Sequence, residues 1–269
     1  MATLAVCSWS LKPKSPRELA NRLKSLDVPR VQLALVPCFT DPAWRDAVDA
    51  LRGDGIAIVS GMLAFAGEDY STIESITATG GVRPDVQWSE NLDRAFACAA
   101  FAERSGIDLV TFHAGFIPHE AGPLRRVMLD RLRTVADLFA QRGVTLALET
   151  GQETATTLRH ALDELDRPGV GVNFDPANMI LYGKGDPVQA IELLASRVRQ
   201  VHVKDACATT TPGTWGRELP VGDGQVAWKP FLALTQGVNL VIEREAGACR
   251  DEDIARARDL VRRLVPTIV

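Results

Sequence analysis

The chain has 269 residues, of which 46% are hydrophobic and 24% are charged. These proportions are typical of a globular protein with a large core, and they exclude disordered and collagen-like chains. Thirty basic and 34 acidic residues leave a formal net charge of −4, which disfavours nucleic acid as a general partner. The five cysteines are scattered and form no Cys-x-x-Cys pair, so neither a disulfide framework nor a thiolate zinc site is indicated.

The start of the chain has no basic region ahead of its short apolar run. The sequence also contains no stretch of about 18 consecutive apolar residues, the length that a membrane-spanning helix needs. We therefore expect a cytoplasmic protein with no membrane partner.

Apolar runs of strand length alternate with segments of helical period along the whole chain. Most of the runs lack an alternation of polar and apolar residues, as is typical of strands buried on both faces. Eight strands are predicted, at residues 4–9, 30–36, 56–63, 109–115, 145–150, 171–175, 199–205 and 239–245.

Helices are predicted between these strands. Three of them begin with a capping residue followed by proline, at Ser15, Asp41 and Asp186. Between the fourth and fifth strands, apolar residues recur every three or four positions from Leu124 to Phe139. Such a stripe is expected to lie against a sheet.

Eight strand–helix pairs without a linker predict an α/β protein with a single-domain (β/α)8 TIM barrel that spans residues 1–269. A doubly wound open sheet is the alternative. Two connections, residues 64–88 and 206–228, are longer than simple turns and follow the carboxyl ends of strands. Active sites of barrels lie on that side, so we expect both connections to act as lids or pocket walls.

Ionisable residues end four consecutive predicted strands: Glu149, Asp175, His202 and Glu243. Each has an ordinary explanation on its own, such as an ion pair, a turn hydrogen bond or a hydrogen-bonded core histidine. A barrel brings strand ends together, however, and three buried carboxylates repel one another unless a cation lies among them. The set of four therefore predicts a site for a divalent metal ion.

Three carboxylates and one imidazole form a shell rich in hard oxygen ligands. Such a shell favours Mn²⁺, with Mg²⁺, Co²⁺ or Zn²⁺ also accepted. The remaining coordination positions suit a substrate with adjacent oxygens, such as a hydroxyketone or hydroxyaldehyde. We therefore expect a small polyol as the substrate.

The segments around these residues resemble the xylose isomerase-like TIM barrel superfamily, a group of sugar isomerases and epimerases that also includes apurinic endonucleases and inosose dehydratase. The resemblance is carried by ALETGQET (147–154), GVNFDPANM (171–179), VHVKDA (201–206), LPVGDGQVAW (219–228) and VIEREAG (241–247). It implies that Glu149, Asp175, His202 and Glu243 hold the metal and that the two glutamates also move a proton. The implied enzyme interconverts aldose and ketose, or keto-sugar epimers, through a cis-enediolate.

Further residues are expected to contact the substrate. His113 ends the fourth strand, Trp9 could stack on a sugar or pack in the core, and Lys204 could stabilise an oxyanion or pair with Asp205. Ketose 3-epimerases that the sequence resembles usually have a second histidine where this chain has Asn178, so the chain departs from that branch. The predicted substrate contacts are His113, Lys204, Asn178, Trp9, Glu153, Trp215 and Arg217.

Other functions compete with the isomerase or epimerase. A dehydratase or other lyase acting on a keto-sugar or inosose shares the first proton removal, and differs in that His113 or Lys204 would protonate the leaving oxygen. An endonuclease-like metallohydrolase is disfavoured because the chain has only four histidines. A sugar-binding barrel without catalysis is the third alternative. Barrels of this size commonly pair, so a homodimer is the expected oligomer.

Overall fold

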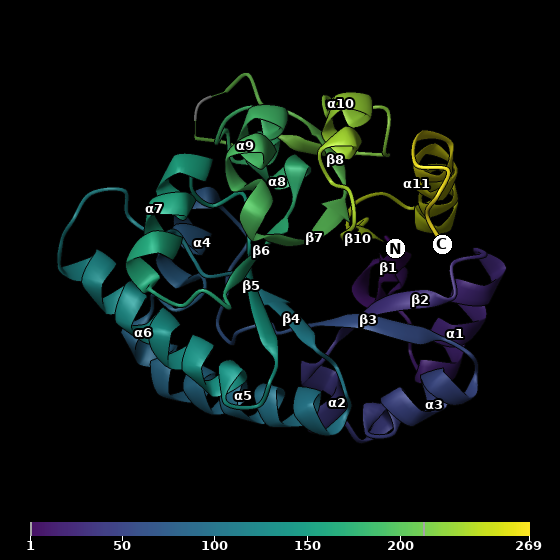
Figure 1. Cartoon of the computed structure of the whole chain (residues 1–269), viewed down its shortest axis with the longest axis horizontal. Coiled ribbons are helices and arrows are strands. Elements are labelled where there is room, and N and C mark those ends of the chain that lie inside the picture. Colours follow the sequence, from purple (N-terminus) through teal and green to yellow (C-terminus); the bar gives the residue numbers. More distant parts are fainter. Residues whose placement is uncertain (1, 212) are drawn as a thin grey trace.

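The computed structural model describes residues 2–211 and 213–269. Eight parallel strands close into a barrel in the order β1–β10–β7–β6–β5–β4–β3–β2, with helices around the outside (Figure 1). The predicted single-domain TIM barrel is thus confirmed in its fold, and the open sheet is wrong. The barrel strands are β1 (Leu4–Cys7), β2 (Arg30–Ala34), β3 (Ala57–Met62), β4 (Leu109–Phe112), β5 (Thr145–Glu149), β6 (Gly171–Phe174), β7 (Val198–Val203) and β10 (Asn239–Ile242).

All eight predicted strands are present, but the predicted ranges run one to three residues too far at their carboxyl ends. The chain leaves the ladder there because its backbone finds other partners at the mouth of the barrel. The backbone N–H of Arg244, for example, donates to Ser10 Oγ at 2.9 Å rather than to a neighbouring strand. The residues that end the apolar runs therefore lie at the mouth.

The helices surround the strands and bury their apolar faces against them. No helix in the described part of the chain combines the length and apolarity that crossing a bilayer requires. The helices are α1 (Pro16–Ser25), α2 (Val36–Thr40), α3 (Ala47–Gly53), α4 (Ile73–Thr79), α5 (Asp85–Arg104), α6 (Pro123–Ala140), α7 (Ala155–Leu165), α8 (Pro176–Leu181), α9 (Pro187–Leu194), α10 (Trp228–Ala233) and α11 (Arg250–Leu264), with 3-10 turns η1 (Ser8–Leu11), η2 (Pro42–Trp44) and η3 (Ala195–Arg197).

Two of the three predicted helix starts are confirmed by their hydrogen bonds, whereas Asp41 caps only the 3-10 turn η2, by accepting from the backbone N–H of Ala43 at 2.9 Å. Ser15 Oγ accepts from the backbone N–H of Glu18 at 3.2 Å, and Asp186 Oδ1 accepts from that of Gln189 at 2.9 Å. Each cap satisfies a backbone donor that has no partner within its own helix. The apolar stripe predicted for α6 is buried from Met128 to Phe139, as expected for a helix lying on the barrel.

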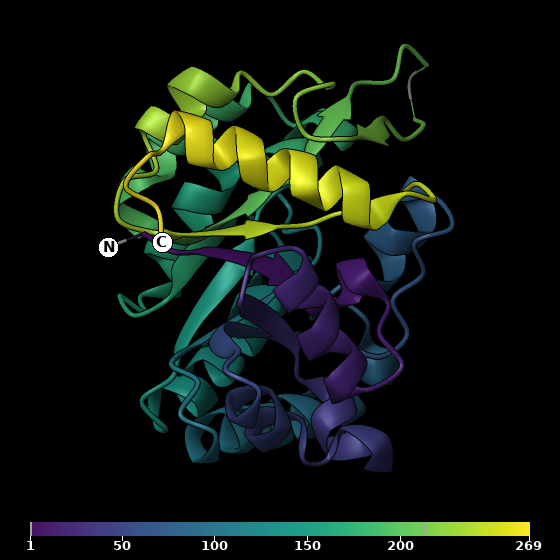
Figure 2. The same ribbon diagram turned by 90° about the vertical axis from the view of Figure 1, so that its right-hand side faces the viewer.

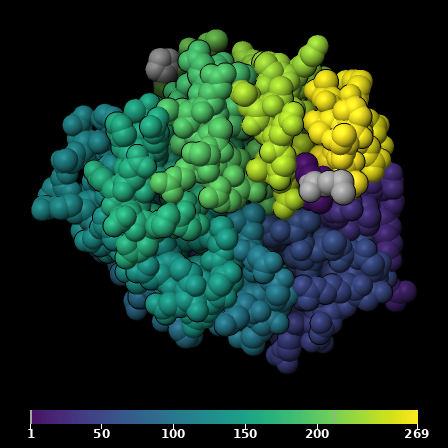
Figure 3. Space-filling view, in the orientation of Figure 1, coloured from purple at the N-terminus to yellow at the C-terminus, as the bar shows by residue number. Residues whose placement is uncertain are grey.

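The two ends of the chain meet where the barrel closes. The backbone N–H of Leu4 donates to the carbonyl of Val269 at 2.9 Å, and β1 pairs in parallel with β10. Figures 1 and 3 place the first and last segments side by side, and Figure 2 shows α11 lying along β10. Closure leaves no free edge in the eight-stranded sheet, so the strand ends hold fixed positions around one mouth.

The two long connections have structure of their own. Residues 64–88 contain α4, and residues 206–228 include most of a small antiparallel sheet formed by β8 (Asp205–Cys207) and β9 (Arg217–Leu219). Figure 2 shows this hairpin projecting from the barrel. The small sheet was not predicted, because strands of three residues carry almost no periodic signal.

A buried carboxylate holds the second connection in place. Asp205 accepts hydrogen bonds from the backbone N–H groups of Gly222, Gly224 and Val226, and from Trp228 Nε1 at 2.8 Å. A Cβ at Gly224 would lie 2.1 Å from Asp205 Oδ1, so only glycine allows this approach. The glycine-rich run 219–228 is therefore wrapped around Asp205.

We predict that Asp205→Ala destabilises the protein by about 3–5 kcal/mol, because several buried N–H donors lose their acceptor together. Urea denaturation followed by circular dichroism would measure the change. Asp186→Ala, which removes one exposed cap, serves as the control with an expected loss of about 1 kcal/mol. Equal losses in the two variants would contradict the role assigned to Asp205.

Candidate metal centre

The structure brings the four ionisable strand-end residues together. Glu149 is the last residue of β5, Asp175 follows β6, His202 lies in β7 and Glu243 follows β10. All four side chains are buried, and one possible ligand atom from each lies within 4.8 Å of the others. The closed barrel creates this cluster, since the four residues are far apart in the sequence.

The spacing of the ligand atoms suits one metal ion. His202 Nδ1 lies 3.4 Å from Glu149 Oε1, 3.7 Å from Asp175 Oδ2 and 3.3 Å from Glu243 Oε2. Ligands about 2.1 Å from an octahedral Mg²⁺ ion are separated by about 3 Å at right angles and by about 4.2 Å across the ion. The observed separations fall between these two values.

The two carboxylate oxygens of Asp175 have different tasks. Oδ1 caps α8 by accepting from the backbone N–H of Asn178 at 2.9 Å. Oδ2 is buried and has no hydrogen-bond partner among the described residues. A buried carboxylate oxygen without a donor is costly, and a cation in the cluster would remove that cost. The donor set and this free oxygen together fit a divalent ion.

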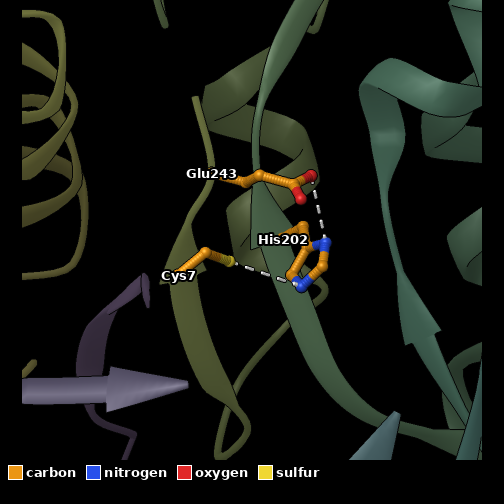
Figure 4. Close-up of side chains that lie close together, drawn as sticks. All are labelled: Cys7, His202 and Glu243. Atoms are coloured by element: carbon orange, nitrogen blue, oxygen red, sulfur yellow. Dashed lines mark hydrogen bonds and ion pairs between the residues drawn. The ribbon is translucent and has the colours of Figure 1, made fainter. Parts of the chain in front are cut away.

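Hydrogen bonding orients the imidazole of His202. Its Nε2 lies 2.8 Å from Gln32 Oε1, which acts as the acceptor and leaves Nδ1 facing the carboxylates. Cys7 Sγ lies 3.8 Å from the same Nε2, away from the Nδ1 that faces Glu243 (Figure 4). Burial raises the pKa of the Cys7 thiol to about 12. Cys7 therefore lies on the Nε2 side of the imidazole, apart from the four ligand atoms around Nδ1, although Cys7, His202 and Glu243 also lie close enough together to share an ion.

The charges of the cluster depend on one another. Burial opposes ionisation of Glu243, but Lys204 and His202 outweigh it and hold the pKa of this carboxyl well below its ordinary value. Burial raises the pKa of Asp175 despite the attraction of Lys204. The carboxylates in turn raise the pKa of His202 well above its ordinary value, although burial acts in the opposite direction. The cluster thus requires positive charge among its carboxylates. A bound divalent ion would supply this charge while the imidazole of His202 is neutral.

A layer of buried polar side chains lies beneath the cluster. Ser60 Oγ donates to Gln200 Oε1 at 2.6 Å, Gln200 Nε2 donates to Asn173 Oδ1 at 3.2 Å, and Asn173 Nδ2 donates to Glu149 Oε2 at 3.2 Å. Sequence reasoning missed these residues. The available signal was a polar residue inside an apolar strand, as with Gln32 in RVQLA, Ser60 in AIVSGM and Asn173 in GVNF.

A cavity of about 620 Å³ opens above the cluster. It reaches the carboxylates through Glu149 and Glu243. Both long connections contribute to its wall, as predicted. Five of the seven predicted substrate contacts line it: Trp9, His113, Asn178, Lys204 and Trp215.

Three of these five residues hold the two glutamates. Trp9 Nε1 donates to Glu243 Oε1 at 2.7 Å, and Asn178 Nδ2 donates to Glu149 Oε1 at 3.1 Å. Lys204 Nζ lies 2.9 Å from Glu243 Oε2. Its second close partner is Glu245, at 2.6 Å, so the alternative of a pair with Asp205 is wrong. Trp9, Asn178 and Lys204 thus fix the orientation of the two carboxylates that face the cavity.

The other two predicted contacts lie elsewhere. Arg217 lies on β9 and is exposed. Because successive side chains of a strand point to opposite faces, the next residue, Glu218, lines the cavity instead. Glu153 lines an adjacent cavity of about 350 Å³. The chain turns at Gly151, where a Cβ would lie 2.3 Å from that of Asn178, before it reaches Glu153. This tight turn against α8 was not visible in the sequence.

Further cavity residues were not predicted. Glu68 and Tyr70 come from the connection after β3, and Tyr182 follows α8. Burial raises the pKa of Glu68, even though His113 and the backbone N–H of Gly81 favour its charged form. These residues lie in loops, where neither period nor spacing indicates the direction of a side chain.

Comparison with known families decides the classification. The family described as xylose isomerase-like TIM barrel matches residues 36–264. The chain belongs to this family. A xylose isomerase domain protein from Planctomyces limnophilus has a crystal structure that is 30% identical, with a TM-score of 0.83 and 91% of each chain covered.

Two curated proteins match parts of this xylose isomerase-like barrel. The uncharacterized protein YihM of Escherichia coli is 28% identical over 138 residues, 49% of this chain and 41% of YihM. A 3-oxo-isoapionate decarboxylase of Pectobacterium atrosepticum is 36% identical over 84 residues, 31% of this chain and 30% of that protein. The chain thus spans less than half the length of the curated relatives it matches.

More distant solved structures share the fold of this xylose isomerase-like barrel. A xylose isomerase-like TIM barrel protein from Mycobacterium smegmatis, solved in complex with magnesium, is 15% identical with a TM-score of 0.72, covering 98% of this chain and 96% of that one. The 3-keto-D-glucoside 4-epimerase YcjR of E. coli is 14% identical with a TM-score of 0.69, covering 96% and 100%. At these identities the likeness shows the fold alone.

We predict that Gln32→Leu lowers the affinity of the protein for Mn²⁺ or Mg²⁺ about 10- to 100-fold, because His202 loses the acceptor that orients its ring. Competition with a chelator would measure the affinity. Asp175→Ala, which removes a predicted ligand, should abolish stoichiometric binding. Unchanged affinity in Gln32→Leu would show that Gln32 does not position His202.

A second prediction concerns Glu153, whose pKa is raised to about 8 by burial. Its protonated form favours the folded state, so this contribution to stability is complete below the ordinary pKa of 4.5 and is lost as the pH rises to about 8. Relative to Glu153→Gln, the wild type should lose up to about 4 kcal/mol over this interval. Urea denaturation of both proteins from pH 5 to 9 measures the difference, and a difference independent of pH would contradict the prediction.

Proposed function

We propose that the chain is a divalent-metal-dependent sugar isomerase or epimerase, which interconverts aldose and ketose or keto-sugar epimers. The observation that carries this proposal is the position of Glu149 and Glu243. Both carboxylates line one cavity, and each has an oxygen within 3.4 Å of the same imidazole nitrogen, His202 Nδ1. Two carboxylates that share a substrate cavity can act as base and then as acid.

Glu149, Asp175, His202 and Glu243 would hold the ion, for which Mn²⁺ or Mg²⁺ is the best match to the ligand set. When bound, such an ion polarises the carbonyl of the substrate and stabilises the negative charge that develops as a neighbouring C–H proton is removed. Asp175 Oδ2, which accepts no hydrogen bond within the described part of the chain and lies 3.8 Å from Lys204 Nζ, supports this assignment.

The proton transfers belong to the two glutamates. One of them removes a proton from the carbon next to the carbonyl, and the other returns a proton at the second carbon or on the second face. Trp9 and Lys204 hold Glu243, while Asn178 holds Glu149, so both carboxylates keep a fixed orientation toward the cavity. Fixed geometry at the reacting atoms reduces the reorganisation that the proton transfer requires.

His113 is assigned to a substrate hydroxyl. It lines the cavity, with Nε2 3.7 Å from Glu149 Oε1 and Nδ1 3.5 Å from Gln152 Nε2. This position lies between a proton-transfer residue and the open cavity. Trp9 and Trp215 present aromatic faces on which a sugar ring can stack. The epimerase YcjR, which has the same fold, supports an activity on keto-sugars.

A lyase acting on a keto-sugar or inosose is the second candidate. Removal of the first proton would be the same, and loss of a neighbouring hydroxyl would follow in place of reprotonation. The position of Lys204 favours this reaction, since its ammonium lines the cavity beside Glu243 and can protonate a leaving oxygen. The similarity of part of the chain to a decarboxylase, which is also a lyase, gives further support.

We predict that the Mn²⁺-loaded protein, incubated with a keto-sugar in D₂O, gives an isomer in which deuterium replaces a carbon-bound hydrogen and from which no water is lost. Glu149→Gln and Glu243→Gln should each lose at least about 100-fold in rate, because each removes one proton-transfer group. Mass spectrometry and NMR measure both effects. Glu192→Gln, an exposed carboxylate of α9, is the matched control.

The possible outcomes separate the two candidates. A product lighter by one water would favour the lyase. Turnover without deuterium at any carbon in the product, or full activity in both Gln variants, would contradict proton transfer by Glu149 and Glu243.

A further inference from the structure

The mouth of the barrel is chemically divided. The half formed by β5, β6, β7 and β10 carries the four ionisable residues of the cluster and Lys204. Of the other four strands, β1 and β4 lead to Trp9 and His113, whereas β2 and β3 contribute five residues at and just beyond their ends to the cavity lining: Ala34, Val36, Pro37, Met62 and Ala64. All five are apolar. The reacting part of a substrate and the rest of it would therefore meet different surroundings.

Aromatic side chains from the segments after β6 and β7 add a second apolar surface to the cavity wall. Tyr182 and Trp215 both line the cavity, and their ring centroids lie 4.8 Å apart at an interplanar angle of 65°. Trp9 and Tyr70 add two more rings to the wall. Aromatic walls of this kind bind apolar rings and the apolar faces of sugars.

Trp215 is held in place although it lies in a hairpin loop. The next residue, Gly216, donates its backbone N–H to the carbonyl of Leu181 at 3.2 Å. A Cβ at Gly216 would lie 2.5 Å from the carbonyl oxygen of Cys207 and 3.1 Å from Leu181 Cα, so any larger residue would push the loop away. The aromatic wall is therefore preorganised, which reduces the entropic cost of binding a ligand against it.

The charges around the cavity exclude an anionic substituent. Glu68 and Glu245 line it in addition to the two glutamates of the cluster. Within the described residues its basic lining consists of His113 and Lys204, and Lys204 already contacts Glu243 at 2.9 Å and Glu245 at 2.6 Å. A phosphate or carboxylate on the substrate would meet carboxylates without an arginine or a free lysine to bind it.

We infer that the substrate is an uncharged keto-sugar that carries an apolar, ring-bearing substituent, such as an aryl glycoside, with this substituent against Trp215 and Tyr182. The inference rests on the proposed function, because the keto-sugar is assigned to the metal cluster. It adds that neither a free sugar nor a sugar phosphate fills the site. The cavity of about 620 Å³ lies in the range of roughly 300–1,000 Å³ that encloses drug-sized ligands.

The test compares binding of four probes to the Mg²⁺-loaded protein by isothermal titration calorimetry. The phenyl and methyl glycosides of 3-keto-β-D-glucose differ only in the apolar ring, and D-fructose 6-phosphate and D-fructose differ only in the anion. We expect the phenyl glycoside to bind about tenfold more tightly than the methyl glycoside. D-fructose 6-phosphate should bind no more tightly than D-fructose.

Trp215→Ala should remove most of the preference for the phenyl group, because it lowers affinity for the phenyl glycoside much more than affinity for the methyl glycoside. Trp88→Ala is the matched control, because Trp88 is also half-buried but lies on α5, with the guanidinium of Arg131 4.9 Å from its ring centroid, and is not part of the cavity. The thermal midpoint and metal content of each variant verify that it is folded and loaded. An unchanged phenyl preference in Trp215→Ala would overturn the assignment of this wall.

Binding also separates this inference from the proposed function. Equal affinities for the phenyl and methyl glycosides, or tighter binding of the phosphate, would overturn the inference even if keto-sugars are turned over. A clear phenyl preference without deuterium exchange or turnover would leave the inference standing and contradict the isomerase. Failure of all four probes to bind would overturn both.

Discussion

The site depends on mutual repulsion among three buried carboxylates. Glu149, Asp175 and Glu243 lie around one imidazole nitrogen, where burial penalises their charged forms. Folding brings them together only because positive charge compensates them, from Lys204 and His202 and, in the proposed enzyme, from a divalent ion. The same imbalance that makes this cluster costly to fold would favour binding of a cation, as proposed.

The rest of the barrel holds this cluster in a fixed geometry. Gln32 orients the imidazole from below, and Asn173 holds Glu149. Above the cluster, Trp9 holds Glu243 through its indole N–H. Because these partners come from β2, β6 and the turn η1, at different places around the closed barrel, His202, Glu149 and Glu243 cannot turn without breaking a hydrogen bond.

The loops complete the chemistry that the strands begin. Asp205 fixes the run 219–228, and Gly216 fixes Trp215 against the end of α8. The strands provide a candidate metal site, which in the proposed enzyme would suit many polyols, whereas the loops decide what else can fit above it. In the proposed enzyme, the apolar residues after β2 and β3 and the aromatic wall would make selectivity depend on the substituent of the sugar.

The sequence by itself determined the eight strands, their order along the chain and the four ionisable residues at their ends, because burial on both faces and a polar strand end leave local patterns. It did not determine the position of Glu153 or Arg217, the partner of Lys204, or the roles of Gln32 and Tyr182. Those depend on turns such as that at Gly151 and on contacts between distant strands. Only the closed tertiary structure decides them, since a side chain's direction in a loop and its partner across a barrel leave no periodic signal.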